Sequence, residues 1–150
     1  NMQGDEPLLK GDELRKLCLF HLEKGGDLAT LIRKRKTVDS DFSSKNVVKV
    51  IYSEITGNCL YFSRAQIPYV IDDKLFSEWY QHIGIYSYKT DALEKFSQAP
   101  QGFYEKRESL EQLRVLEIGM TIKGLITEAK LIGVDTPGDI AKVERELTNG

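Results

Sequence analysis

The sequence has no excess of basic residues. Its 150 residues include 21 lysines and arginines against 23 aspartates and glutamates, which gives a net charge of −2. Proteins that bind a nucleic-acid backbone usually carry a basic face and a high pI, whereas the pI of this chain is about 5.8. The composition therefore argues against a nucleic-acid partner, and we expect the chain to bind a small molecule or a protein.

Long apolar runs and paired cysteines are also lacking. No stretch approaches the ~20 apolar residues of a membrane span, and the first residues lack the charged-then-apolar pattern of a signal peptide. The two cysteines form no CxxC motif: Cys18 lies in a helical pattern and Cys59 in a strand pattern. We therefore expect two buried, reduced thiols in a cytoplasmic protein with no membrane partner, rather than a disulfide or a zinc site.

The chain shows no internal repeat and no low-complexity tract, and its length suits one domain. A chain of this size buries about 70% of the surface that its unfolded form exposes, so it can hold a real core. It opens on Asn1, and Met2 already has the character of the end of a buried strand. We expect residues 1–150 to form a single domain that is the later part of a longer protein.

Strand and helix patterns alternate along the first third of the chain. After the strand-like start, Asp12 can begin a helix and Gly25 and Gly26 can end it. The predicted inward face of this helix consists of Leu14, Leu17, Cys18, His21 and Leu22. Residues 28–35 follow as a strand, and a strand-helix-strand unit has parallel strands. This predicts an α/β fold, in which the basic run at residues 33–36 is a solvated strand exit with no assigned role.

The middle of the chain predicts an antiparallel hairpin inserted in this sheet. Residues 47–52 and 59–62 are rich in β-branched and aromatic side chains and flank a glycine turn at residues 56–58. We place this hairpin in a subdomain of about residues 47–69. The later pattern predicts strands at residues 80–88 and 121–127 and one continuous helix at residues 105–116. The sheet is thus expected to be mixed.

Two turns that combine glycine, aspartate and proline are the candidate metal site. They are Gly4-Asp5-Glu6-Pro7 and Gly133-Val134-Asp135-Thr136-Pro137. A single turn of this kind is explained by backbone chemistry alone, because glycine and proline set its dihedral angles. Their recurrence, each after a strand-like stretch, favours a ligand site at strand ends. Because Mg²⁺ prefers carboxylate oxygens, Asp5 and Asp135 are the predicted ligands and catalytic residues.

The candidate substrate contacts lie on three other segments. Arg64 leaves the end of a predicted strand, and its planar guanidinium matches a carboxylate, although a surface arginine is an equal alternative. His82 and Tyr86 share one face of a strand, where a structural histidine is the alternative. Polar side chains at 108–112, taken alone, are more typical of ordinary helix capping than of a binding site. Of these residues, Arg64 is the one that could hold an acidic substrate.

Four stretches taken together resemble the carboxyl-terminal part of the 3-deoxy-D-manno-octulosonate (Kdo) cytidylyltransferase family. The resemblance extends from Asn1 to about Leu147. It is carried by Gln3-Gly4-Asp5-Glu6-Pro7, by Tyr61-Phe62-Ser63-Arg64-Ala65-x-Ile67-Pro68, by His82-Ile83-Gly84-Ile85-Tyr86, and by Glu108-Ser109-Leu110-Glu111-Gln112-Leu113-Arg114 with Gly133-Val134-Asp135-Thr136-Pro137. Each piece is weak alone, and their joint occurrence in this order is specific.

The resemblance implies a cytoplasmic, usually dimeric, Mg²⁺-dependent enzyme of lipopolysaccharide synthesis. Such an enzyme joins CTP and Kdo into CMP-Kdo and releases pyrophosphate, so CTP and Kdo are the implied substrates. The implied fold is a Rossmann-like nucleotidyltransferase, and Asp5 and Asp135 are the implied Mg²⁺ ligands. The residues implied to surround Kdo are Gln3, Arg64, His82, Tyr86, Glu108, Ser109 and Gln112.

One feature of the family is missing from the sequence. The glycine- and arginine-rich loop that cradles the CTP phosphates, and the segment that follows it and recognises cytosine, do not occur in these residues. We therefore expect the chain alone to be inactive. Two alternatives stay open: a cytidylyltransferase for another acidic sugar, such as sialic acid, and a non-catalytic segment that acts only in binding or assembly.

Overall fold

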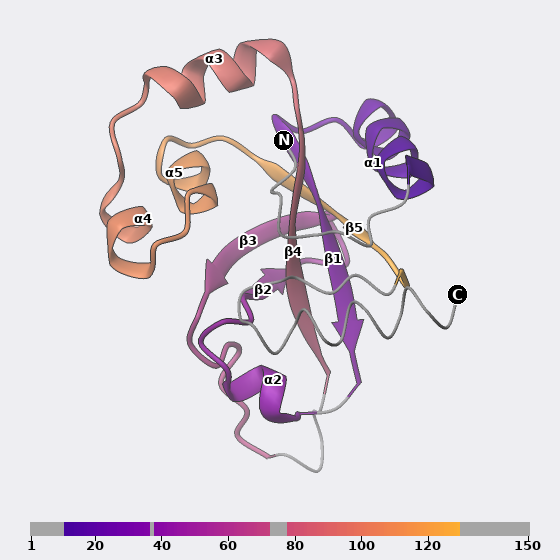
Figure 1. Cartoon of the computed structure of the whole chain (residues 1–150), viewed down its shortest axis with the longest axis vertical. Helices are drawn as coiled ribbons and strands as arrows, with labels where there is room; N and C mark the ends of the chain where they lie inside the picture. The colour runs from indigo at the N-terminus through magenta and orange to yellow at the C-terminus, as the bar shows by residue number, and fades with distance from the viewer. Residues whose placement is uncertain (1–10, 37, 73–77, 130–150) are drawn as a thin grey trace.

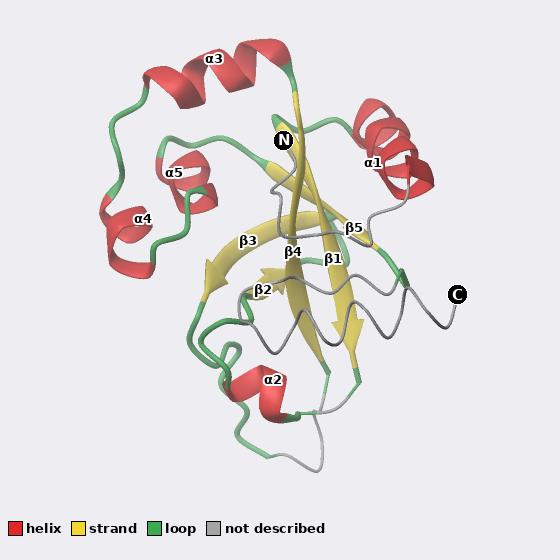
Figure 2. Ribbon diagram, in the orientation of Figure 1, coloured by secondary structure: helices red, strands yellow, loops and turns green. Residues whose placement is uncertain are grey.

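The described part of the chain is built on one sheet that closes on itself. The computed structural model describes residues 11–36, 38–72 and 78–129. The strands are β1 (Leu28–Arg35), β2 (Lys49–Tyr52), β3 (Asn58–Ser63), β4 (Trp79–Tyr88) and β5 (Ile122–Ile126). The helices are α1 (Gly11–Lys24), α2 (Ser40–Ser43), α3 (Thr90–Gln98), α4 (Phe103–Glu108) and α5 (Gln112–Glu117). The strands follow the order β1-β4-β2-β3-β5 around a barrel (Figures 1 and 2).

Strand β1 contributes apolar side chains to a core on each of its two faces. Leu28 and Ile32 face a core shared with β2, β3, α3 and α5, whereas Ala29 and Leu31 face a second core beneath α1. This alternation is the period of two that a strand imposes. Helix α1 therefore covers one side of the strands, and α3, α4 and α5 lie on the other (Figure 1). Within the described residues no helix has the length and apolar character needed to cross a bilayer.

Helix α1 confirms the predicted helix, but its buried face is narrower than predicted. Leu17 and His21 are buried, whereas Leu22 is 83% exposed and the Cys18 thiol is exposed. The expectation of two buried cysteines is therefore correct for Cys59 and wrong for Cys18. The reason is that α1 rests on β1, β4 and β5 along a single stripe, and Cys18 and Leu22 lie at its margin.

The predicted hairpin is confirmed, and it is fully integrated into the sheet. β2 and β3 pair antiparallel around the Gly57 turn, where φ is +70°. β2 also pairs with β4, and β3 also pairs with β5, so the hairpin closes the barrel. β1 and β5 are parallel, which makes the sheet mixed. The expected pairing of the chain's first residues with β1 lies outside the described residues.

The prediction of a single helix at residues 105–116 is wrong. The structure has two short helices, α4 and α5, separated at Ser109, whose φ of 52° places it in the left-handed region. A left-handed residue ends an α-helix because it turns the following carbonyl away from the axis. The leucines at 110, 113 and 116 still pack on the core, Leu110 from the connection between the helices and the other two from α5. The break turns the end of α4 toward Arg64.

The basic run at residues 33–36 is also not the solvated exit that we predicted. Arg33 donates to the Ala129 carbonyl, and Lys34 forms ion pairs with Glu54 (3.2 Å) and Glu78 (2.9 Å). These pairs join β1 to the ends of β2 and β4. The run is consequently held by contacts within the protein.

Candidate functional site

Arg64 follows β3 and binds three backbone carbonyls with its guanidinium. Its Nε donates to the Glu108 carbonyl at 2.8 Å, one terminal nitrogen to Lys45 at 2.9 Å, and the other to Ser109 at 3.4 Å. Arg64 thus connects the α2–β2 loop to the break between α4 and α5. A guanidinium has five N–H donors, so two, one on each terminal nitrogen, have no partner among the described residues. Two donors on two nitrogens are what a bidentate carboxylate requires.

The Glu108 carboxylate fixes the backbone from which Arg64 projects. It accepts from the Arg64 amide at 2.7 Å, from the Ser63 hydroxyl at 2.8 and 2.9 Å, and from the Tyr61 hydroxyl at 3.3 Å. These three donors fill three of the about four lone-pair positions of a carboxylate. Glu108 is therefore mainly engaged within the protein, and the described residues leave one of its acceptor positions unfilled.

A pocket of about 450 Å³ opens beside these groups. Its lining residues are Lys45, Asn46, Arg64 and Ser109. Beneath it lies Lys49, which is 0% exposed and donates to the carbonyls of Ser44, Val47 and Arg64. Burial lowers the pKa of Lys49 and the nearby Arg64 charge lowers it further, whereas Glu108 raises it. The pocket is lined and supported by cationic side chains, which suits an anion.

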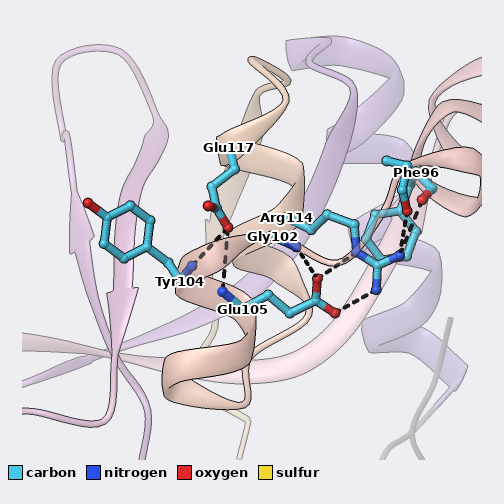
Figure 3. A network of polar contacts seen from close by, with 7 residues as sticks. Phe96, Gly102, Tyr104, Glu105, Arg114 and Glu117 are labelled. Carbon is cyan, nitrogen blue, oxygen red and sulfur yellow. Dashed lines mark hydrogen bonds and ion pairs between the residues drawn. The ribbon is translucent and has the colours of Figure 1, made fainter.

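A buried ion pair holds α4 against α5 and so positions Glu108 and Ser109 (Figure 3). Arg114 donates to both carboxylate oxygens of Glu105 at 2.7 and 2.5 Å, and the two side chains are only 13% and 4% exposed. The hydrogen bond from Arg114 lowers the pKa of Glu105 despite its burial. Removing one partner of such a pair costs about 3–5 kcal/mol, because the other charge is left buried and unpaired.

Glu117 makes a second connection between the two helices, from the end of α5 to the start of α4. Its carboxylate accepts from the backbone amides of Phe103 (2.9 Å), Tyr104 (3.2 Å) and Glu105 (3.4 Å), two of which Figure 3 shows. These amides have no partner within α4, and a carboxylate is favoured at this end of a helix. A Cβ at Gly102 would overlap the Glu117 carboxylate, so the contact requires glycine there.

His82 is buried and neutral. Burial lowers its pKa to about 3, and its ring packs 4.9 Å from Phe62 and 5.4 Å from Tyr86. The Thr30 hydroxyl lies 3.2 Å from Nε2 and donates to the Ile85 carbonyl at 2.8 Å. Because that hydroxyl has one proton, it accepts from Nε2–H, which assigns the proton to Nε2 and leaves Nδ1 as an acceptor.

Tyr86 and Gln112 are two further buried candidate residues. Burial raises the pKa of Tyr86 well above its ordinary value, so its hydroxyl keeps its proton. Gln112 is buried, and its Nε2 has no hydrogen-bond partner among the described residues. A buried amide without a partner costs free energy, and a ligand group is one way to satisfy it.

The structure collects the described candidate residues into two clusters that meet at the end of β3. Arg64, Glu108 and Ser109 form one, and His82 and Tyr86 the other, while Gln112 is buried at the start of α5 and is in neither. Phe62 contacts His82, and the next two residues of the chain bind Glu108. The remaining candidates Gln3, Asp5 and Asp135 lie outside the described residues. Residues 11–36, 38–72 and 78–129 contain no group of three or more potential metal ligands.

Sequence reasoning missed Lys49 and Ser63. Lys49 interrupts the apolar run Val47–Ile51, in which both faces of the strand are otherwise apolar. A lysine at such a position is a signal of a buried charge with backbone partners. Ser63 carries no comparable signal, since a serine at the end of a strand is common at turns.

A family model described as cytidylyltransferase matches residues 1–122. Among curated relatives, the 3-deoxy-manno-octulosonate cytidylyltransferase of Parabacteroides distasonis is 39% identical over 99% of this chain and 62% of its own length. The enzyme of the same name from Thermodesulfovibrio yellowstonii is 41% identical over 98% of this chain and 59% of its own length.

A solved structure is similar over the same extent. It is described as CMP:2-keto-3-deoxy-manno-octonic acid synthetase complexed with CTP, and it superposes with a TM-score of 0.86 at 32% identity, over 99% of this chain and 61% of that one. The chain thus spans about three fifths of the length of the proteins it matches. Its sequence and its α/β fold place it among these proteins: the chain belongs to the cytidylyltransferase family.

Proposed function

We propose that this chain supplies the sugar-acid-binding part of a Rossmann-like enzyme that transfers CMP from CTP to Kdo. The observation that carries the proposal is Arg64, whose guanidinium is held by three carbonyls at the rim of a pocket and keeps two donors. A rigid arginine with two donors left is suited to the carboxylate of a sugar acid. The names of the relatives support the same substrate.

The other candidate residues receive roles that follow from their partners. We propose that the Nδ1 of His82, the hydroxyl of Tyr86 and the unpartnered amide of Gln112 bind sugar hydroxyls. Glu108 keeps one acceptor position and chiefly positions Arg64, while Ser109 lines the pocket. Gln3 is proposed as a further Kdo contact.

In the proposed reaction the anomeric hydroxyl of Kdo attacks the α-phosphorus of CTP. A new O–P bond forms, the bond to the β-phosphate oxygen breaks, and pyrophosphate and the hydroxyl proton leave. A pKa of about 3 makes His82 a poor general base at neutral pH. We therefore assign His82 to binding and orientation, in which its fixed tautomer is useful.

We propose that Asp5 and Asp135 would hold Mg²⁺, since their carboxylates are the donors that this ion prefers. When bound, the ion would act as a Lewis acid on phosphate oxygens and would orient the substrates.

The test uses a chimera in which this chain replaces the matching part of the Parabacteroides distasonis relative. We expect the chimera to form CMP-Kdo and pyrophosphate from CTP and Kdo, to stop when EDTA removes divalent metal, and to resume with Mg²⁺. Arg64→Lys should raise the KM for Kdo by about tenfold or more and leave that for CTP nearly unchanged, because a point charge cannot replace the guanidinium fork. Arg107→Lys, at an exposed arginine of α4, is the matched control.

The alternatives predict different results. Faster turnover of sialic acid than of Kdo would assign the chain to a different sugar acid. No product with either sugar, from a chimera that is folded by circular dichroism, would refute the catalytic proposal. Equal weakening of Kdo and CTP by Arg64→Lys would show that Arg64 is only structural.

A further inference from the structure

Lys49 is a buried lysine on β2 for which the reaction itself supplies no role. It is 0% exposed, and its ammonium donates to the carbonyls of Ser44 at 2.9 Å, Val47 at 2.7 Å and Arg64 at 2.6 Å. Three acceptors require three N–H donors, and only the protonated lysine has three. A buried charge is costly unless it is fully hydrogen-bonded, so this arrangement keeps a full positive charge beneath the pocket.

The three carbonyls are those that flank the pocket lining. Ser44 and Val47 stand directly before and after the lining residues Lys45 and Asn46, and the third carbonyl belongs to Arg64 itself. The Lys45 carbonyl in turn accepts from the Arg64 guanidinium at 2.9 Å. The Lys49 ammonium therefore joins the 44–47 loop, which forms one wall of the pocket, to the end of β3 at Arg64, which forms the other.

We propose that Lys49 is a positioning residue for the sugar-acid pocket, which fixes the 44–47 loop against Arg64 so that the guanidinium is held ready for a carboxylate. The identity of the ligand rests on the proposed function, whereas the contacts of Lys49 do not depend on it. Lys49 does not line the pocket and acts on the ligand only through Arg64 and the loop.

The geometry can be tested in this chain without any ligand. In ¹⁵N-labelled protein, solvent exchange of the Arg64 Nε proton reports on its bond to the Glu108 carbonyl. Lys49→Met, which removes the donors and keeps most of the side-chain length, should accelerate this exchange by about tenfold or more, the factor expected from loss of a charged hydrogen bond. The Nε proton of Arg114, held by Glu105, should change by less than about twofold and serves as the internal reference.

Lys123→Met is the matched control variant. Lys123 also lies on a strand and donates to one backbone carbonyl, that of Thr56, and it does not line the pocket. It should leave Arg64 exchange unchanged. If Lys49→Met does not fold, Lys49→Arg decides the question: it keeps the charge but displaces the donors, and exchange at Arg64 should still rise more than at Arg114. Unchanged exchange at Arg64, or equal acceleration at both arginines, would overturn the proposal.

The functional consequence is measured in the chimera described above. Lys49→Met should raise the KM for Kdo and leave the KM for CTP within about twofold, and Lys49→Arg should give an intermediate KM for Kdo. Equal changes for both substrates would contradict a role at the sugar-acid pocket. A parent chimera that makes no CMP-Kdo would refute the proposed function, while the exchange measurement would still decide on Lys49.

Discussion

Thr30 shows how one buried hydroxyl can serve both fold and site. It is 0% exposed on β1, where the pairing with β4 shifts register. Its hydroxyl contacts the carbonyls of Ile83 at 3.2 Å and Ile85 at 2.8 Å as well as His82. The two carbonyls belong to the segment of β4 where the register shifts. Ile83 and Ile85 face the core beneath α1, and Tyr86 faces the other core. The same hydroxyl therefore stabilises the bulge and orients the histidine.

Thr30→Val is expected to destabilise the chain by about 1–3 kcal/mol, because it keeps the shape and leaves buried carbonyls and an imidazole nitrogen without a partner. Urea unfolding measures the loss. The ¹⁵N spectrum of the His82 imidazole should change from one tautomer to a mixture. Thr90→Val, at an exposed threonine at the start of α3, is the control. A folded Thr30→Val with the imidazole spectrum of the parent chain would disprove the orienting role.

Among the helices and strands, the sequence pattern predicted correctly those elements that are stabilised by contacts between residues close in sequence. The β-branched and aromatic runs around Gly57 predicted the β2–β3 hairpin. Helix α2 is also held by a local contact, because the Asp39 side chain accepts from the amides of Asp41 and Phe42. The α4–α5 break was missed because the leucine spacing on both sides fits one helix. What breaks it is tertiary: Arg64 takes the Glu108 and Ser109 carbonyls.

The same limit applies to the candidate site. Arg64, His82 and Tyr86 could be selected from residue type and strand position. The use of Glu108 by Ser63 and the Arg64 amide depends on contacts between residues 44 and 45 positions apart, which no local pattern encodes. Lys49 was overlooked for a similar reason, because two of its acceptors are nearby carbonyls and the third is 15 positions away.

The contact between Gly102 and Glu117 gives a test of the α4–α5 unit. Gly102→Ala should destabilise the chain by about 1–2 kcal/mol, the usual value of a lost helix cap, because the new Cβ displaces the Glu117 carboxylate. In a Glu117→Ala background the space is free, and Gly102→Ala should then cost less than about 0.5 kcal/mol. Chemical unfolding of the four proteins completes the cycle. Additive costs would mean that the two residues do not interact.

For the whole molecule, the buried neutral state of His82 links stability to pH. The ordinary pKa of 6.5 applies to the unfolded chain, and burial lowers the pKa to about 3 in the folded chain. Between these values the unfolded chain binds one more proton, so stability falls as pH falls below 6.5, with a limiting slope of about 1.4 kcal/mol per pH unit. Urea unfolding at several pH values between about 7.5 and about 5, a range that spans the ordinary pKa of histidine, measures the slope.

Carboxylates with lowered pKa values cause a second loss of folding stability at lower pH. The Arg114 hydrogen bond lowers the pKa of Glu105, and the Thr121 amide lowers that of Asp27. Their contribution is present above the ordinary carboxyl pKa values of 4.5 and 3.8 and is lost as pH falls through the lower folded values. His82→Gln should abolish the slope above pH ~5 and leave the acid loss. A parent chain whose stability does not change between pH 7 and 5 would show that His82 titrates normally.

The parallel pairing of β1 with β5 has a consequence for the order in which the molecule is made. It joins Leu28 to Ile122, and beside it Asp27 accepts from the Thr121 amide at 2.8 Å across 94 positions of chain. A ribosome completes β1, β4, β2 and β3 before the residues that close the ring exist. Until then the edges of β1 and β3 that β5 later covers are open to other strands, and closing so long a loop is the slow kind of step. We therefore expect aggregation to begin in incomplete chains that leave the ribosome before β5, which ends at Ile126, has been synthesised.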